Sequence, residues 1–145
     1  MDMLEKLIGT WELCSWTYRE DGGKETDYIG DNPGGILMFD RSGWMNVQVH
    51  AADRKNFASE GIMGGKAEEI REAFTTYFAY YGTYEVGIED STIVHRVEGA
   101  LFPNWIGDKQ VRKVLFRDDH LFLTTPPLQA AGRERMFTLK WRRVS

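Results

Sequence analysis

The chain has 145 residues, the size of one domain, and 42% of them are hydrophobic and 28% charged, which excludes an intrinsically disordered protein. Its formal net charge is −4, so it lacks the net positive charge that would attract nucleic acids or anionic membranes. Cys14 is the only cysteine, which excludes an intrachain disulfide. We therefore expect a single domain over 1–145, located in the cytoplasm, that binds neither nucleic acid nor membranes.

The first residues predict a short helical turn. Asp2 and Glu5 have the spacing of a capping box, and Leu4, Leu7 and Ile8 form the apolar side of the turn.

Eight segments rich in aromatic and β-branched residues follow, and turn-forming residues separate most of them. They are 9–19, 35–39, 44–50, 83–88, 92–98, 110–117, 120–125 and 135–144. Short strands at regular spacing with tight turns are typical of an all-β sandwich or barrel. We expect a closed antiparallel up-and-down barrel.

Residues 66–81 break this pattern. Apolar side chains recur there at helical spacing, namely Ile70, Phe74, Tyr77, Phe78 and Tyr81. Gly82 then occupies a position typical of a helix C-cap. The pattern predicts one helix inserted into the meander and packed on the barrel, either as a buried cover or as a gate. The preceding residues, 51–65, are expected to form an irregular loop over the barrel mouth.

Several motifs resemble those of known barrel proteins. Gly9-Thr10-Trp11 looks like the opening signature of the lipocalin superfamily, in which the tryptophan packs across the closed end of the barrel beside an arginine of the last strand. Arg142 or Arg143 would supply that arginine through a cation–π contact. The further matching strings are Tyr81-Gly82-Thr83-Tyr84, His95-Arg96-Val97-Glu98-Gly99, Phe102-Pro103-Asn104-Trp105 and Thr125-Pro126-Pro127.

Together these motifs resemble a bacterial family of lipocalin-like domains. The resemblance covers essentially the whole chain and implies a small intracellular calycin-type barrel that binds a hydrophobic small molecule. Some members of that family occur beside polyketide biosynthetic genes. The resemblance supports the fold more than any particular ligand, because one fold hosts many functions.

Two polar residues lie on apolar strand faces and are candidates for the cavity. His95 shares its face with Ile93 and Val97, and Arg112 shares its face with Val114 and Phe116. A structural histidine and a solvent-facing arginine are the alternatives. Glu98 is a further catalytic candidate, although its parity opposes that of His95 unless a bulge at Gly99 re-aims it.

The remaining candidates are aromatic or amide side chains expected to wall the same cavity. They are Trp44, Gln48, Tyr77, Tyr81, Tyr84, Phe102 and Trp105, with Tyr77 or Tyr81 reaching in from the helix.

The sequence leaves more than one function open. The first is a barrel that binds a flat hydrophobic or acidic ligand, such as a polyketide, a fatty acid or an aromatic acid. The alternative is a cofactor-independent cyclase, dehydratase or isomerase that uses His95 and Arg112. A scaffold with a filled core is the third. His50, His95 and His120 have no metal-ligand spacing, so we expect no metal and no cofactor. A homodimer is compatible with the sequence.

Overall fold

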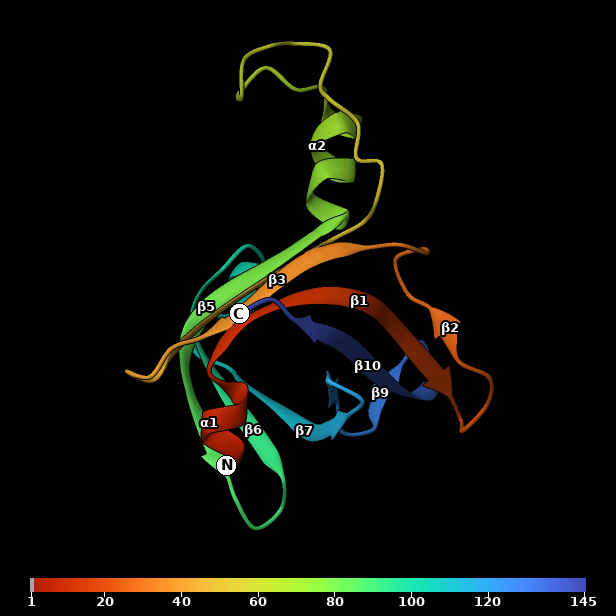
Figure 1. Cartoon of the computed structure of the whole chain (residues 1–145). Coiled ribbons are helices and arrows are strands. Elements are labelled where there is room, and N and C mark those ends of the chain that lie inside the picture. Colours follow the sequence, from red (N-terminus) through yellow and green to blue (C-terminus); the bar gives the residue numbers. More distant parts are fainter. Residues whose placement is uncertain (1) are drawn as a thin grey trace.

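The sheet closes on itself into a barrel of eight antiparallel strands in the computed structural model, which describes residues 2–145 (Figure 1). The barrel strands are β1 (Gly9–Glu20), β3 (Gly34–Phe39), β4 (Trp44–His50), β5 (Tyr77–Gly87), β6 (Thr92–Ala100), β7 (Lys109–Arg117), β8 (His120–Thr124) and β10 (Arg133–Arg143). Two short strands, β2 (Thr26–Asp27) and β9 (Leu128–Ala130), extend β1 and β10. The predicted all-β barrel is confirmed.

The closing contact is the pairing of β1 with β10. It runs from Trp11 opposite Arg143 to Glu20 opposite Arg135, which is nearly the full length of both strands. A β-bulge at Cys14 interrupts the register. A bulge bends its strand and increases the local twist, so β1 can pair with β3 near its start and with β2 near its end.

One end of the barrel is closed by α1 (Met3–Leu7), the predicted helical turn. The side chain of Asp2 accepts the backbone N–H of Glu5 at 2.9 Å. Trp11 is 2% exposed, and its indole Nε1 donates to the carbonyl oxygen of Leu7 at 2.9 Å. The guanidinium of Arg143 lies 4.2 Å from the centre of the Trp11 ring. The predicted tryptophan–arginine contact of the closed end is confirmed.

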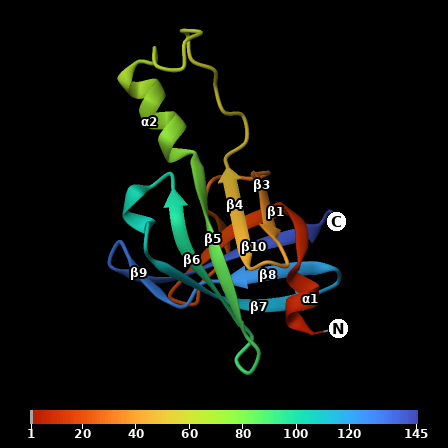
Figure 2. The ribbon, with the colours of Figure 1, turned by 90° about the vertical axis from the view of Figure 1, so that its left-hand side faces the viewer.

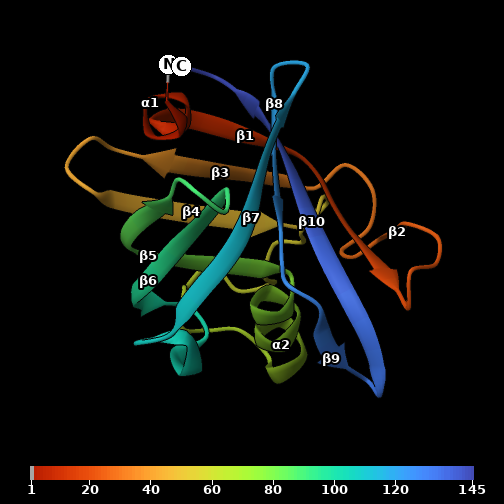
Figure 3. The same cartoon turned by 90° about the horizontal axis from the view of Figure 1, so that it is seen from below.

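The C-terminal end of the chain lies beside the start of β1 at this closed end (Figure 3). The N–H of Thr10 donates to the carbonyl oxygen of Ser145 at 3.0 Å.

The helix predicted over 66–81 is shorter than expected. It is α2 (Ala67–Thr75), and the aromatic residues after it begin β5. The aromatic residues 77–81 are also favourable in a strand. Pairing with β4 on one side and β6 on the other stabilises the strand over a longer helix. Gly82 is not a helix cap but lies in β5 opposite a bulge of β6 at Glu98, and a Cβ atom on it would collide with the carbonyl oxygen of Arg96.

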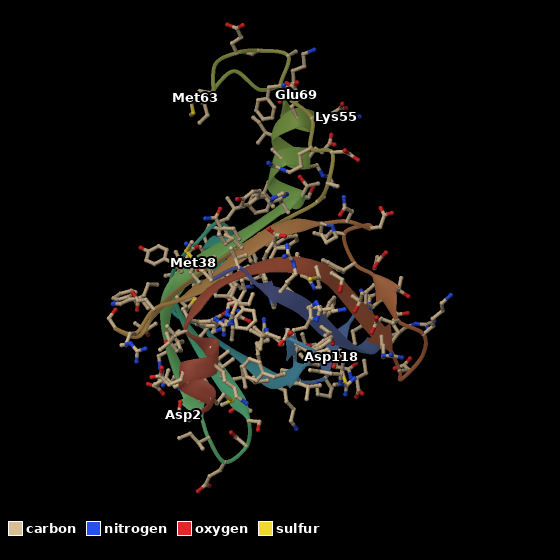
Figure 4. The ribbon with its side chains drawn as sticks, viewed as in Figure 1. Asp2, Met38, Lys55, Met63, Glu69 and Asp118 are labelled. Atoms are coloured by element: carbon tan, nitrogen blue, oxygen red, sulfur yellow. The ribbon has the colours of Figure 1, made fainter. Side chains whose placement is uncertain are left out.

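Residues 51–76 form an arm that projects from the open end of the barrel (Figure 2). Figure 4 shows Met63 at its far end, and no residue of α2 is buried. The arm has its own hydrogen bonds: Arg54 donates to the carbonyl oxygen of Ala73 at 3.0 Å, and Glu69 accepts the N–H of Ala58 at 2.8 Å. The expectation of a helix packed on the barrel, with a loop over the mouth, is therefore wrong. Only the last turn of α2 reaches the barrel rim.

The closed end yields the first prediction. Trp11→Ala should lower the free energy of unfolding by about 3–5 kcal/mol, because it removes a large buried side chain, an indole hydrogen bond and the surface on which Arg143 lies. Trp44→Ala is the matched control, since Trp44 is 45% exposed, and should cost about 1 kcal/mol or less. Denaturant unfolding measures both. Equal costs for the two variants would contradict this placement of Trp11.

Candidate functional site

A cavity of about 80 Å³ lies inside the barrel, between the packed closed end and the open end. This is room for several water molecules or a small ring. Its walls are mostly apolar, from Trp16, Leu37, Val47, Val49, Phe78, Trp105, Leu123, Leu139 and Trp141, with Tyr80, His95 and Arg112 as the polar exceptions.

The polar exceptions come from three neighbouring strands. Tyr80 lies on β5, His95 on β6 and Arg112 on β7, and all face inward. The Tyr80 hydroxyl and Nδ1 of His95 are 2.7 Å apart and share a hydrogen bond. The three side chains form one polar cluster on an apolar wall.

His95 is neutral in this environment. It is 2% exposed, and burial together with the nearby positive charge of Arg112 lowers the pKa of its imidazole to about 3. Burial likewise raises the pKa of the Tyr80 phenol to about 12, so Tyr80 keeps its proton at neutral pH.

In the neutral imidazole, Nε2 is either a hydrogen-bond donor or an acceptor, depending on the tautomer. If Tyr80 donates to Nδ1, Nε2 carries the proton and is a donor. If Nδ1 donates to the Tyr80 oxygen, Nε2 is an acceptor. Nε2 is buried and has no hydrogen-bond partner among residues 2–145. Nothing in the described residues therefore fixes which tautomer His95 adopts.

Two more buried nitrogens on the cavity-lining residues lack a partner within the described chain. They are the indole Nε1 atoms of Trp16 and Trp141. An indole N–H can only donate, and a buried donor without an acceptor costs about 1–3 kcal/mol. Residues of the cavity wall therefore carry buried donors that residues 2–145 leave unpaired.

Arg112 has only neutral acceptors. It donates to the carbonyl oxygen of Val111 at 2.8 Å and to the side-chain oxygen of Gln110 at 3.1 Å. Burial lowers the pKa of its guanidinium. No carboxylate of residues 2–145 lies within 4.0 Å of it.

An apolar hollow of about 360 Å³ adjoins the cavity at the open end. Phe78 and Trp105 belong to the walls of both spaces. The hollow is bounded on its outer side by Phe74 of α2 and by Phe102, which precedes the 3₁₀ turn η1 (Pro103–Trp105). Phe78 and Trp105 thus form a wall common to the hollow and the cavity.

Of the predicted site residues, His95, Arg112 and Trp105 line the cavity. Trp44 and Tyr81 do not, because they are 45% and 52% exposed on the outside of the barrel. Trp44 begins β4 with its side chain opposite in parity to the buried Met45. Tyr81 was expected to reach in from a helix, but on β5 it has opposite parity to Tyr80.

The other candidates also lie outside the cavity walls. Gln48 alternates with the inward Val47 and Val49, and it accepts a hydrogen bond from the hydroxyl of Tyr77. Tyr84 is buried in the core towards the closed end, where its hydroxyl donates to the carbonyl oxygen of Asp40 at 2.6 Å.

Phe102 lies in the hollow at the open end, not in the cavity. Glu98 is exposed at a bulge, which does not turn it towards His95. A His95–Glu98 dyad is therefore excluded by the geometry.

Sequence reasoning missed Trp16, Phe78, Tyr80 and Trp141. Phe78 and Tyr80 were assigned to the helix, because the run 77–81 is almost entirely aromatic and its pattern does not distinguish a helix from a strand. The inward orientation of Trp16 was missed because of the bulge at Cys14, since a bulge changes which residues of a strand face inward.

The fold and the cavity can be set beside known proteins. Residues 8–144 match the lipocalin-like domain family. The chain belongs to this family. A relative from Aspergillus oryzae is 35% identical over 107 residues, which are 69% of this chain and 96% of the relative. That relative is named as a 4'-hydroxy-3'-methoxypropiophenone carrier protein.

Within the part of this lipocalin-like domain that the structure describes, no group of three histidine, cysteine, aspartate or glutamate side chains could hold a metal ion. The described helices are also too short and too polar to cross a membrane.

The buried imidazole of this lipocalin-like domain predicts a pH dependence of stability. The pKa of His95 is about 3 in the folded state and about 6.5 in an unfolded chain. The unfolded state therefore binds one more proton between these values, and the free energy of unfolding falls as the pH falls through this range. The loss from His95 alone should be about 2 kcal/mol between about pH 7 and about pH 5.

His95→Phe should remove this contribution and flatten the dependence of unfolding free energy on pH. Tyr80→Phe is the control, because it loses the hydrogen bond but keeps the buried imidazole and hence the slope. Urea unfolding at several pH values measures both. An unchanged slope in His95→Phe would show that His95 is not held neutral by burial.

Proposed function

We propose that this lipocalin-like domain is a carrier that holds a small flat aromatic molecule with oxygen acceptors in its internal cavity. One observation carries the proposal. The three buried nitrogens without a partner, on Trp16, His95 and Trp141, all belong to residues that line the same cavity. Acceptor oxygens on a ligand would pair with these donors and with the guanidinium of Arg112, while the apolar walls would contact its ring.

The ligand in the name of the Aspergillus relative has this chemistry. 4'-Hydroxy-3'-methoxypropiophenone combines one benzene ring with a carbonyl, a methoxy and a hydroxyl oxygen. Aromatic side chains in the cavity wall can contact the ring of such a ligand. Two of them, Tyr80 and Trp105, already pack against each other with 5.9 Å between their ring centroids. The small volume of the cavity favours a single-ring compound over a long acyl chain.

The protonation states favour a carrier over the alternative of a cofactor-independent enzyme. An efficient general base has a pKa near the working pH. The pKa values of about 3 for His95 and about 12 for Tyr80 lie far from neutrality, so neither group is suited to take up or release a proton there.

Titration with 4'-hydroxy-3'-methoxypropiophenone, an aromatic acid and a fatty acid tests the carrier directly. Tryptophan fluorescence is the readout, because Trp16, Trp105 and Trp141 line the cavity. We expect one molecule of the ketone to bind per chain. The corresponding hydrocarbon without oxygens should bind at least about tenfold more weakly, since it leaves the buried donors unpaired. Absence of binding by all three classes would contradict the proposal.

A matched pair of variants tests whether the ligand binds inside the cavity. Val49→Phe adds a ring inside the cavity, whereas Val111→Phe makes the same change at an exposed position. The first should lower the affinity at least about tenfold and the second should leave it unchanged. Thermal unfolding checks that both variants fold. Equal affinities would mean that the ligand binds elsewhere.

A further inference from the structure

Among residues 2–145, Arg112 is the one charged side chain in the walls of the cavity. It lies on the inward face of β7 with Val114 and Phe116, and its two hydrogen-bond acceptors are neutral. A cation in an apolar surrounding is costly unless an anion pairs with it. No carboxylate in residues 2–145 approaches it within 4.0 Å.

The other residues that line the cavity do not compensate this charge. The walls from β1, β3, β4, β8, β10 and η1 contribute only apolar side chains and indoles. β5 and β6 contribute Tyr80 and His95, both neutral at pH 7. The described side chains of the cavity wall therefore have a net charge of +1, and a ligand with one negative charge would neutralise it.

We propose that the cavity binds hydroxyaryl ligands as the phenolate, with the ligand oxygen paired with the guanidinium of Arg112. This rests on the proposed carrier function and adds the charge state of the cargo. The O–H bond of the ligand breaks on binding, its electron pair stays on oxygen, and the proton passes to the solvent buffer. His95, as its Nε2–H tautomer, supplies a second donor to the same oxygen.

Two effects on the phenol oppose each other. Removal from water disfavours the anion, whereas an adjacent opposite charge lowers the pKa of an acid by about 1–3 units. The charge effect wins in this cavity because burial has already removed much of the water around Arg112. The ion pair thus removes an unpaired charge instead of adding a second one.

The absorbance spectrum of bound 4'-hydroxy-3'-methoxypropiophenone tests the proposal, because a phenolate absorbs at longer wavelength than its phenol. In the wild-type protein, titrated from about pH 5 to about pH 9, the bound ligand should ionise at least about one pH unit below the free ligand. The 4'-methoxy analogue cannot ionise and should bind at least about tenfold more weakly at neutral pH. These two comparisons need no variant.

Variants assign the effect to Arg112. Arg112→Met should shift the ionisation of the bound ligand above that of the free ligand, and Arg112→Lys should restore the downward shift. Lys113→Met is the matched control, since it removes the same charge from the adjacent, exposed position. Arg112→Met removes an unpaired cation, so we expect it to fold, and thermal unfolding verifies this.

The outcomes separate the two proposals. Binding seen by tryptophan fluorescence, with a bound ligand that ionises at or above the pH of the free ligand, overturns the phenolate proposal and leaves the carrier intact. A downward shift that persists in Arg112→Met also overturns it. Absence of binding overturns the carrier itself.

Discussion

The pairing of β1 with β10 is the contact on which the rest of the structure depends. It converts a meander with two free edges into a closed surface, and closure is what gives the sheet an inside. An inside of low polarity then determines the behaviour of every polar group placed there. The neutral imidazole of His95, the protonated phenol of Tyr80 and the unpaired cation of Arg112 all follow from burial within this closed wall.

The interior is divided into two parts with different packing. Towards the closed end, Trp11, Phe39 and Tyr84 are buried in the core under α1, and the ring of Tyr84 packs on Phe39 at 4.8 Å between centroids. Towards the open end, large aromatic side chains surround a space that they do not fill. The first part stabilises the barrel, and the second has the apolar walls and few polar groups that a ligand site requires.

Much of this was predictable from the sequence, because strands with period-two alternation and tight turns specify a barrel locally. The contact of Trp11 with Arg143 was predicted from a motif, and inward positions of His95 and Arg112 were one of two alternatives that strand parity left open. The errors have two physical sources. The aromatic residues of 74–81 fit helical spacing, but the run 77–81 is also apolar enough for a strand, and only pairing with neighbouring strands decides between the two. The bulge at Cys14 changes parity within β1, and a bulge of this kind leaves no clear trace in one sequence.

A crystal structure of the protein with 4'-hydroxy-3'-methoxypropiophenone is the most direct measurement of whether the cavity is a ligand site. The ring should lie beside Tyr80 and Trp105, with one ligand oxygen within hydrogen-bonding distance of both His95 Nε2 and the guanidinium of Arg112. A ligand found only in the hollow against Phe74, or a cavity left unchanged by saturating ligand, would contradict the assignment of this cavity as the carrier site.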